Sequence, residues 1–276
     1  MLIRTMDDME KAGRIVSISH GRATAVRPLT KSDGMGFSVS EARGRAGSGS
    51  DLWYKNHWEA NYVRSGRGWV QDLTSGQKWD LEPGMMYIVG PKDRHHIQSS
   101  DEEAIRVIST FNPPIEGDET HDDDGAYPPT GDIPEGPGRM LVRSRDDVAA
   151  QGLAFSRADG ASRIARFVTA GDKLGFAISE VRFKQGREAD LWYKNHWEAN
   201  LVLDGTFEVT ERNTGDVHTM GPGALYCVGP NDPHHIKAVT DVRLISVFNP
   251  PLEGHETHDE DGAYPPTGPL PPGPTG

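Results

Sequence analysis

The stretch Asp51–Asn61 reads DLWYKNHWEAN, and the same eleven residues return at Asp190–Asn200, an offset of 139. A second stretch, His121–Gly131, reads HDDDGAYPPTG and returns as HDEDGAYPPTG at His258–Gly268, an offset of 137. Self-similarity at a nearly constant offset is the mark of a repeat architecture. The sequence therefore predicts one structural unit built twice, with two residues missing from the second copy.

The repeats fix the expected domain boundaries. The first copy runs over residues 1–131 and the second over residues 140–268, with residues 132–139 as the linker between them. The last stretch, residues 269–276, is rich in Pro and Gly, and we expect it to be a disordered tail.

Short, interrupted segments point to an all-β fold. The chain has 32 Gly and 20 Pro among 276 residues, which favours many tight turns. Strand-like runs cover residues 36–40, 59–63, 68–73, 85–89 and 105–111. Thr74–Gly76 and Asn213–Gly215 read as hairpin turns, and residues 6–13 as a short helix. Strands of this length and spacing predict a sandwich or barrel in each copy.

Composition excludes several classes of function. The net charge is −12 and no Lys/Arg cluster is present, so we expect no nucleic-acid partner. No apolar run is long enough for a membrane span or a signal peptide. The single cysteine, Cys227, cannot form an internal disulfide and reads as inert core, which fits a reducing, cytoplasmic setting.

Eight of the eleven histidines fall in matched pairs between the two copies, whereas His20, His218 and His255 have no counterpart. A surface histidine has no physical reason to be kept twice, although a recent duplication would also keep it. The pairs are His57/His196, His95/His234, His96/His235 and His121/His258.

One carboxylate, one phenol and one imidazole recur at identical spacing. They are Glu59, Tyr87 and His95 in the first copy and Glu198, Tyr226 and His234 in the second. Glu59 opens a predicted strand, Tyr87 follows the turn that starts the next strand, and His95 begins the strand after that. We expect these three strands to be neighbours whose inward side chains converge. An O,O,N set suits Fe(II) or another divalent metal. The alternative is a core tyrosine beside a surface glutamate.

Two further sets could carry chemistry. A Pro-Pro pair ends a strand before Glu119 and His121, and before Glu256 and His258, so that a loop could present an acid/base pair. The alternative is a hydrogen bond between loop and barrel. If Trp53–Asn56 is a strand, Tyr54 and Asn56 share one face. Tyr54, like Tyr193, is then a proton donor, a substrate contact or a core residue.

Long motifs in each copy resemble ectoine synthase, a single-domain cupin. They include Met1–Thr5, Asp33–Phe37, Trp53–His57, Pro83–Tyr87, Asp93–His95, Phe111–Pro114 and His121–Pro128. The resemblance covers almost all of each copy. It implies two tandem cupin barrels of the jelly-roll type, that is, a bicupin. Because family members are dimeric, we expect the two cupins to form an intramolecular pseudo-dimer, with a homodimer of the whole chain as a further alternative.

The resemblance also implies an activity and a site. Members close N-γ-acetyl-diaminobutyrate to ectoine with loss of water, and they bind iron(II) at positions that match the six ligands above. The catalytic positions match Tyr54, Glu119, His121, Tyr193, Glu256 and His258, and the substrate-binding positions match Arg27, Phe111, Arg166 and Phe248. The metal would polarise the amide carbonyl as a Lewis acid, and the substrate amine would attack it.

The sequence departs from the family at the wall of the substrate pocket. A family tryptophan falls at Ala23 and Ser162, and a His-x-Thr segment is replaced so that Ala42 and Val181 stand at its end. The sequence therefore leaves the small-molecule substrate open. An iron cupin of different chemistry, such as an oxygenase, and a non-enzymatic bicupin that binds a small solute remain the alternatives.

Overall fold

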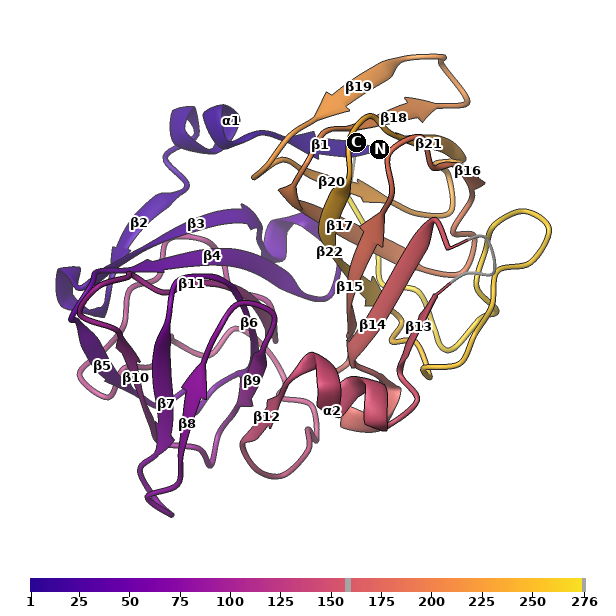
Figure 1. The fold of residues 1–276 in the computed structure, drawn as a ribbon. Coiled ribbons are helices and arrows are strands. Elements are labelled where there is room, and N and C mark those ends of the chain that lie inside the picture. The colour runs from indigo at the N-terminus through magenta and orange to yellow at the C-terminus, as the bar shows by residue number, and fades with distance from the viewer. Residues whose placement is uncertain (157–159, 275–276) are drawn as a thin grey trace. The chain divides into compact units, whose positions relative to one another are not determined.

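The computed structural model describes residues 1–156 and 160–274 and divides the chain into two compact units. One unit, the first barrel, is Asp7–Ser144, and the other, the second barrel, combines Met1–Met6 with Arg145–Gly276. The prediction of an all-β cupin-type fold is confirmed, since the helices are confined to a few short turns (Figure 1). None of the helices in the described ranges is long and apolar enough to cross a membrane.

The first barrel is a sandwich of a seven-stranded and a four-stranded antiparallel sheet. The larger sheet has the order β12-β9-β6-β11-β4-β3-β2 and the smaller one β5-β10-β7-β8. The elements are α1 (Met6–Lys11), β2 (Ile15–Ile18), β3 (Ala23–Leu29), β4 (Ser38–Gly44), β5 (Gly49–Leu52), β6 (Trp58–Ser65), β7 (Gly68–Asp72), β8 (Lys78–Leu81), β9 (Met86–Val89), β10 (His95–Ser99), β11 (Arg106–Asn112) and β12 (Leu141–Arg143).

The second barrel repeats this plan, with the sheet orders β1-β20-β17-β22-β15-β14-β13 and β16-β21-β18-β19. Its elements are β1 (Leu2–Arg4), α2 (Arg145–Ala150), β13 (Ala154–Ser156), β14 (Ser162–Val168), β15 (Ala177–Phe183), β16 (Glu188–Leu191), β17 (Trp197–Asp204), β18 (Phe207–Glu211), β19 (Val217–Met220), β20 (Leu225–Val228), β21 (His234–Ala238) and β22 (Val242–Asn249).

Inward side chains of both sheets form the core of each barrel. In the first barrel Val63 and Val107 from the larger sheet pack with Leu52, Val70 and Leu81 from the smaller one. Alternate residues of a strand face the same side, yet the outward residues of the central strands β6 and β11, such as Ala60, Tyr62 and Ile108, are buried as well. The predicted hairpin turns join β7 to β8 and β18 to β19, as expected.

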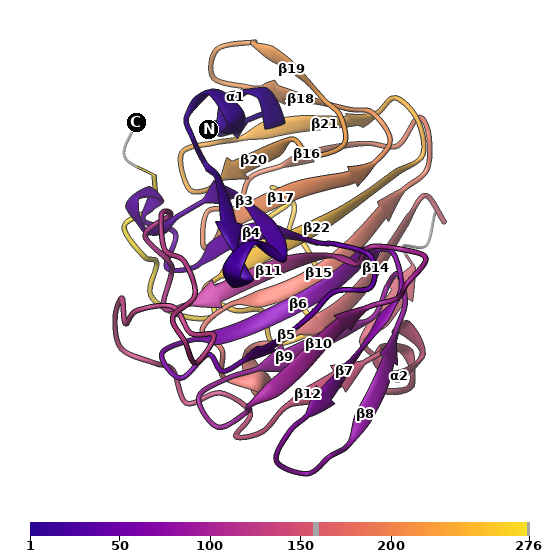
Figure 2. The same ribbon diagram turned by 90° about the vertical axis from the view of Figure 1, so that its left-hand side faces the viewer.

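The compact units do not coincide with the sequence repeats, because each sheet ends on a strand from the other repeat. Strand β1 pairs with β20, with Ile3 opposite Tyr226. Strand β12 pairs with β9, with Val142 opposite Tyr87 (Figures 1 and 2). Residues 1–6 thus complete the sheet of the second barrel, whereas the predicted boundary assigned them to the first copy.

The prediction of a disordered tail is wrong for residues 269–274, while residues 275–276 lie outside the described ranges. The indole N–H of Trp197 donates to the carbonyl of Pro271 at 3.1 Å. A Cβ on Gly273 would stand 1.9 Å from the same indole ring, so the chain packs flat against it. The linker does the same: the indole of Trp58 donates to the carbonyl of Pro134 and lies against Gly136.

The pairing of β1 with β20 and of β12 with β9, each across the two repeats, predicts which strand a substitution will destabilise. Ile3 packs against the core of the second barrel, so we expect Ile3→Asp to lower the local opening free energy of β20 by about 1–3 kcal/mol, because it places a charge at a half-buried site. Hydrogen exchange measured strand by strand would show faster exchange in β20 and unchanged exchange in β9.

The matched control is Val142→Asp, at the equivalent position of β12, which should have the opposite pattern. Faster exchange of β9 in the Ile3→Asp variant would contradict the observed pairing.

Candidate active site

Two of the candidate metal ligands lie on adjacent strands of the larger sheet. In β6, Glu59 and Asn61 point into the barrel, and Tyr87 of β9 stands directly opposite Asn61. Glu59 and Tyr87 both line the cavity of the first barrel. The second barrel has Glu198 and Tyr226 in the corresponding places on β17 and β20.

The third candidate ligand comes from the facing sheet, which corrects the expectation that all three strands are neighbours. His95 begins β10, which pairs with β5 and β7 rather than with β9. The barrel nevertheless brings the rings together, since the ring centre of His95 lies 6.3 Å from that of Tyr87 and 6.1 Å from that of Tyr54. Convergence therefore results from closure of the sandwich and not from strand order.

A backbone carbonyl fixes the tautomer of this histidine. Nδ1 of His95 lies 3.0 Å from the carbonyl oxygen of Asp93, which can only accept, so Nδ1 carries the hydrogen. Nε2 then holds a lone pair, and it is buried without a hydrogen-bond partner. Burial lowers the pKa of His95 to about 4, so the ring is neutral at pH 7. His234 repeats this arrangement with the carbonyl of Asp232 at 2.9 Å.

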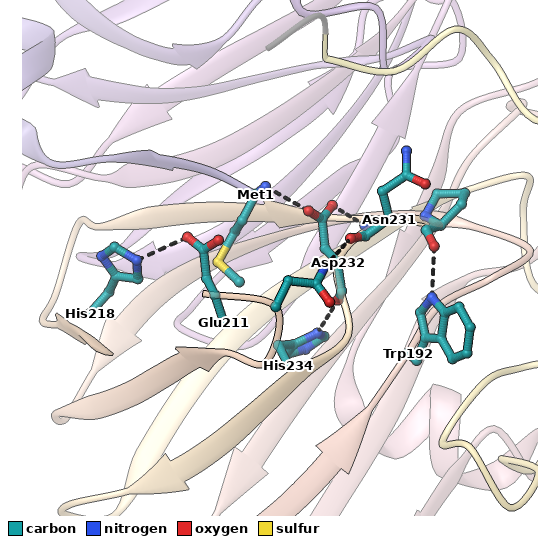
Figure 3. Close-up of polar contacts among 10 residues, drawn as sticks. Met1, Trp192, Glu211, His218, Asn231, Asp232 and His234 are labelled. Carbon is teal, nitrogen blue, oxygen red and sulfur yellow. Dashed lines mark hydrogen bonds and ion pairs between the residues drawn. The ribbon is translucent and has the colours of Figure 1, made fainter. Parts of the chain in front are cut away.

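Figure 3 shows how the turn before His234 is held. A carboxylate oxygen of Asp232 accepts a hydrogen bond from the amino nitrogen of Met1 at 2.6 Å, and the backbone carbonyl of Asp232 faces His234. In the first barrel the carboxylate of Asp93 accepts from the backbone N–H of Met140 at 2.9 Å. The residue that precedes each exchanged strand therefore anchors the turn that carries the histidine.

Among the residues that the structure describes, no cationic side chain forms an ion pair with the buried carboxyl group of Glu59. Burial raises its pKa to about 7, although hydrogen bonding with Asn61 and Ser109 acts in the opposite direction. Ser109 in turn donates to the Oδ1 of Asn61 at 2.5 Å. The second barrel has the same set, in which burial raises the pKa of Glu198 to about 7. This Asn–Ser pair was not predicted, even though Asn61 lies within the repeated stretch.

The residues present fit a bound metal. A buried imidazole with an unpartnered Nε2, a buried carboxyl group without a counterion and a buried phenol are groups that a cation would satisfy. Within the described ranges, no group of three or more His, Cys, Asp and Glu side chains could hold a metal ion. A metal at this position would therefore depend on the tyrosine as its third ligand.

Tyr54 and His121 meet at the same cavity. Ser19 donates its backbone N–H to Nδ1 of His121 at 3.2 Å, so Nδ1 accepts and Nε2 carries the hydrogen. Burial, assisted by Arg27, lowers the pKa of His121 to about 4 and keeps the ring neutral. Nε2 then donates to the hydroxyl oxygen of Tyr54 at 3.0 Å, which leaves the hydroxyl hydrogen of Tyr54 for another acceptor.

The segment that carries Tyr54 is not a strand, contrary to the expectation. Residues 53–57 form an irregular turn between β5 and β6. Its outer side is held by Lys55, which contacts the Asp124 carboxylate at 2.7 Å. Asn56 donates to the carbonyl of Tyr127 at 2.7 Å. These contacts explain why the turn and the loop after His121 are repeated together in the sequence.

Arg27 and Glu119 form a buried ion pair beside the cavity. The guanidinium contacts the Glu119 carboxylate at 3.2 Å and its carbonyl at 2.6 Å. The same carboxylate accepts from the backbone N–H groups of Glu116 and Gly117 at 2.5 and 2.8 Å. Neither Arg27 nor Glu119 is among the residues that line the cavity. The ion pair therefore holds the loop that carries His121.

The corresponding ion pair of the second barrel joins Arg166 to Glu256. Burial raises the pKa of the Glu256 carboxyl, but backbone hydrogen bonds and the nearby Arg166 outweigh it and bring that pKa below its usual value.

Phe248 lines the second cavity, and Phe111 makes an edge contact with Tyr54 in the first, with ring centres 5.5 Å apart. Tyr193 and His258 both line the second cavity, and the hydroxyl oxygen of Tyr193 lies 3.3 Å from Nε2 of His258.

These sandwiches, each with a cavity between its two sheets, define a bicupin. Solved structures agree on the fold: the Lactobacillus farciminis oxalate decarboxylase formate complex has a TM-score of 0.64 at 11% identity over 92% of this chain and 87% of that one. A Bacillus subtilis oxalate decarboxylase, whose structure is described for its Mn(II) centres, has a TM-score of 0.61 at 14% identity and covers 93% of this chain and 78% of its own.

The family model described as ectoine synthase matches residues 1–131 and 140–268, and the chain belongs to this family. The L-ectoine synthase of Oceanobacillus iheyensis is 41% identical over 126 residues, which are 46% of this chain and 97% of that protein. That of Saccharopolyspora erythraea is 38% identical over 126 residues, 46% of this chain and 92% of that protein. One relative thus corresponds to about half of this chain.

The raised pKa of Glu59 predicts a pH dependence of stability for the metal-free protein. A carboxyl group whose pKa rises from 4.5 to about 7 on folding stabilises the fold below pH 4.5, and this contribution is lost as the pH rises through 7. We expect Glu59→Gln to remove the loss, so that the variant gains roughly 3 kcal/mol over the parent between pH 4 and pH 8.

Denaturant unfolding of both proteins across this range measures the difference. The exposed Glu82→Gln is the matched control and should follow the parent at every pH. A difference between Glu59→Gln and the parent that stays constant with pH would show that the carboxyl group is not buried as described.

Proposed function

We propose that each barrel catalyses the ring closure of N-γ-acetyl-diaminobutyrate to ectoine with loss of water. The observation that carries this proposal is the arrangement common to both barrels: a buried carboxyl group and a buried tyrosine that line a cavity, and a neutral histidine with an unpartnered Nε2 whose ring centre lies 6.3 Å (His95) or 6.4 Å (His234) from that of the tyrosine. Membership of the ectoine synthase family supports the substrate and the reaction.

We assign a metal, Fe(II), to Glu59, Tyr87 and His95, and a second one to Glu198, Tyr226 and His234. A metal held there supplies a Lewis acid that polarises the amide carbonyl of the substrate. The protein contributes a cavity between its two sheets, which would hold the amine and the carbonyl of one substrate molecule in contact and so favour the intramolecular attack. The neutral His95, fixed by the carbonyl of Asp93, offers its lone pair without first losing a proton.

Tyr54 is the proton donor in this proposal. Its hydroxyl oxygen already accepts from His121, so its own hydrogen is directed to another acceptor. The amide oxygen leaves as water and therefore takes up two protons, and the attacking amine gives up two protons as it forms the C=N bond of the ring. The phenol relays one proton at ring closure and one at loss of water: each time it gives its proton to the oxygen and regains one from the nitrogen, which leaves Tyr54 unchanged after each turnover.

Glu119 has a positioning role. Its carboxylate is engaged by Arg27 and by two backbone N–H groups, so it holds the loop that carries His121. The same reasoning assigns Glu256 and Arg166 to the loop of His258. Phe111 and Phe248 pack edge-on against Tyr54 and Tyr193, and Phe248 also lines its cavity.

Anaerobic loading with Fe(II), followed by incubation with N-γ-acetyl-diaminobutyrate and detection of ectoine by NMR, tests the proposal. We expect product from the parent, and none from a Glu59→Ala, Glu198→Ala double variant, because each barrel loses its carboxylate ligand. Each single variant should bind one iron per chain and keep the activity of the other barrel. Iron at two per chain without any product would mean that the substrate is a different molecule.

The tyrosine role has its own test. We expect a Tyr54→Phe, Tyr193→Phe double variant to lose about 10²- to 10⁴-fold in kcat, the range for removal of a general acid. Its iron content should stay at two per chain, since the phenol of Tyr54 is not among the assigned ligands. A double variant that keeps the parental kcat would remove these phenols from the mechanism.

A further inference from the structure

The walls of the two cavities differ at equivalent positions. Away from the Glu, Tyr and His groups, three small residues of the first cavity are replaced by larger ones in the second, in the pairs Ala42/Val181, Gly44/Phe183 and Ser48/Arg187. The pairs Ala23/Ser162 and Ser50/Ala189 exchange alanine and serine with little change of size. Register confirms the equivalence, because Ala23 pairs with Gly44 on β3 and β4, and Ser162 with Phe183 on β14 and β15.

Two of these changes make a new contact. The Nε of Arg187 donates to the Oγ of Ser162 at 3.2 Å, and both residues line the second cavity. Arg187 also donates to the carbonyl of Glu188, and its own carbonyl accepts from the N–H of Ala238 at 2.9 Å. Ser162 is buried, and Arg187 is half-buried. The guanidinium is therefore held at the wall rather than extended into solvent.

Arg187 stands at one end of a row that leads to the candidate metal site. Ala189, Leu191 and Tyr193 follow it at every second residue and line the same cavity. Leu191 pairs with His234. A strand rise of about 3.3 Å per residue puts the Cα atoms of Arg187 and Leu191 roughly 13 Å apart. Arg187 and the candidate metal ligand His234 therefore lie at opposite ends of this row.

Much of the cavity that Arg187 lines is apolar. Phe183 stacks on Phe207 with ring centres 6.0 Å apart, and Ile164, Leu191 and Ile236 complete this side of the cavity. A charge-assisted hydrogen bond is stronger where water is excluded. Arg187 is the one cationic side chain among the residues that line this cavity within the described ranges.

The first cavity has a cation at a different place. Arg22 lines it and is exposed, and the corresponding position in the second copy is Ala161. At the position of Arg187 the first copy has Ser48, whose hydroxyl donates to the carbonyl of Arg45 at 2.7 Å and closes a turn. A carboxylate bound in the first cavity would thus meet a guanidinium from another wall.

We propose that Arg187, positioned by Ser162, binds the carboxylate of a short acylated diamino acid in the second cavity, and that the two cavities consequently differ in the substrates they prefer. The class of ligand rests on the proposed function. The site itself rests on the contact between Arg187 and Ser162 and on the wall that surrounds it.

Equilibrium binding to the full iron-loaded chain tests this inference. The background carries Glu59→Ala, so that iron loads in the second cavity alone, and Tyr193→Phe, which suppresses turnover. The two ligands are N-γ-acetyl-diaminobutyrate and its carboxamide, which lacks the negative charge. We expect the carboxylate to bind about 10- to 100-fold more tightly, the range for one hydrogen bond to a charged group.

Arg187→Ser, which installs the residue of the first copy, should abolish this preference, and Arg187→Lys should keep part of it. Ser162→Ala should reduce it, because Arg187 loses its partner. Arg212→Ser, at an exposed arginine paired with Asp190, is the matched control and should keep the full preference.

Equal binding of the two ligands by the background protein, binding of neither, or an unchanged preference in Arg187→Ser would each overturn the inference. Turnover of the Glu59→Ala chain is measured separately. If that chain makes no ectoine while the preference for the carboxylate depends on Arg187, the proposed reaction fails and the carboxylate site stands.

Discussion

One aspartate in each barrel joins three parts of the structure that the site needs. The carboxylate of Asp93 accepts from the N–H of Gly90 and from the N–H of Met140, both at 2.9 Å, while its carbonyl receives the hydrogen bond of His95. The turn, the exchanged strand and the imidazole are therefore fixed together. Asp232 makes the corresponding contacts with Gly229, Met1 and His234. The orientation of the histidine thus depends on a strand that comes from the other repeat.

The chemistry of the cavity follows from burial and hydrogen-bond direction. Removal from water keeps both histidines neutral and holds the Glu59 carboxyl near the point of ionisation at pH 7. Carbonyl and amide groups of the backbone then decide which nitrogen of each ring carries a hydrogen. The two rings receive opposite assignments, since the Asp93 carbonyl accepts from one and the Ser19 N–H donates to the other. One ring, His95, holds a buried lone pair on Nε2, and the other, His121, donates to the phenol of Tyr54.

Sequence patterns predicted the parts of this fold that depend on local chemistry. The repeat, the hairpin turns and the inward direction of Glu59 follow from residue spacing, and the structure has them. Strand order does not follow from spacing, so the place of His95 on the facing sheet was missed. The strand exchange could not be predicted either, because residues 2–4 and 141–143 carry the same pattern and could pair equally well with β9 or β20. The tail was misjudged since Pro and Gly suggest disorder, whereas here they let the chain lie flat on Trp197.

The joining of two copies in one chain has a consequence for how the cavities can evolve. A gene for a single repeat imposes every mutation of the wall on all copies of the cavity that it encodes. In this chain the equivalent positions Ser48 and Arg187 are encoded by separate codons, and so are Ala23 and Ser162. Selection can therefore act on one wall while the other keeps an earlier specificity, although the residues around Glu59 and Glu198 stay alike. The duplication therefore allows the residues that bind substrate to diverge between the two barrels while the candidate metal ligands are kept in both.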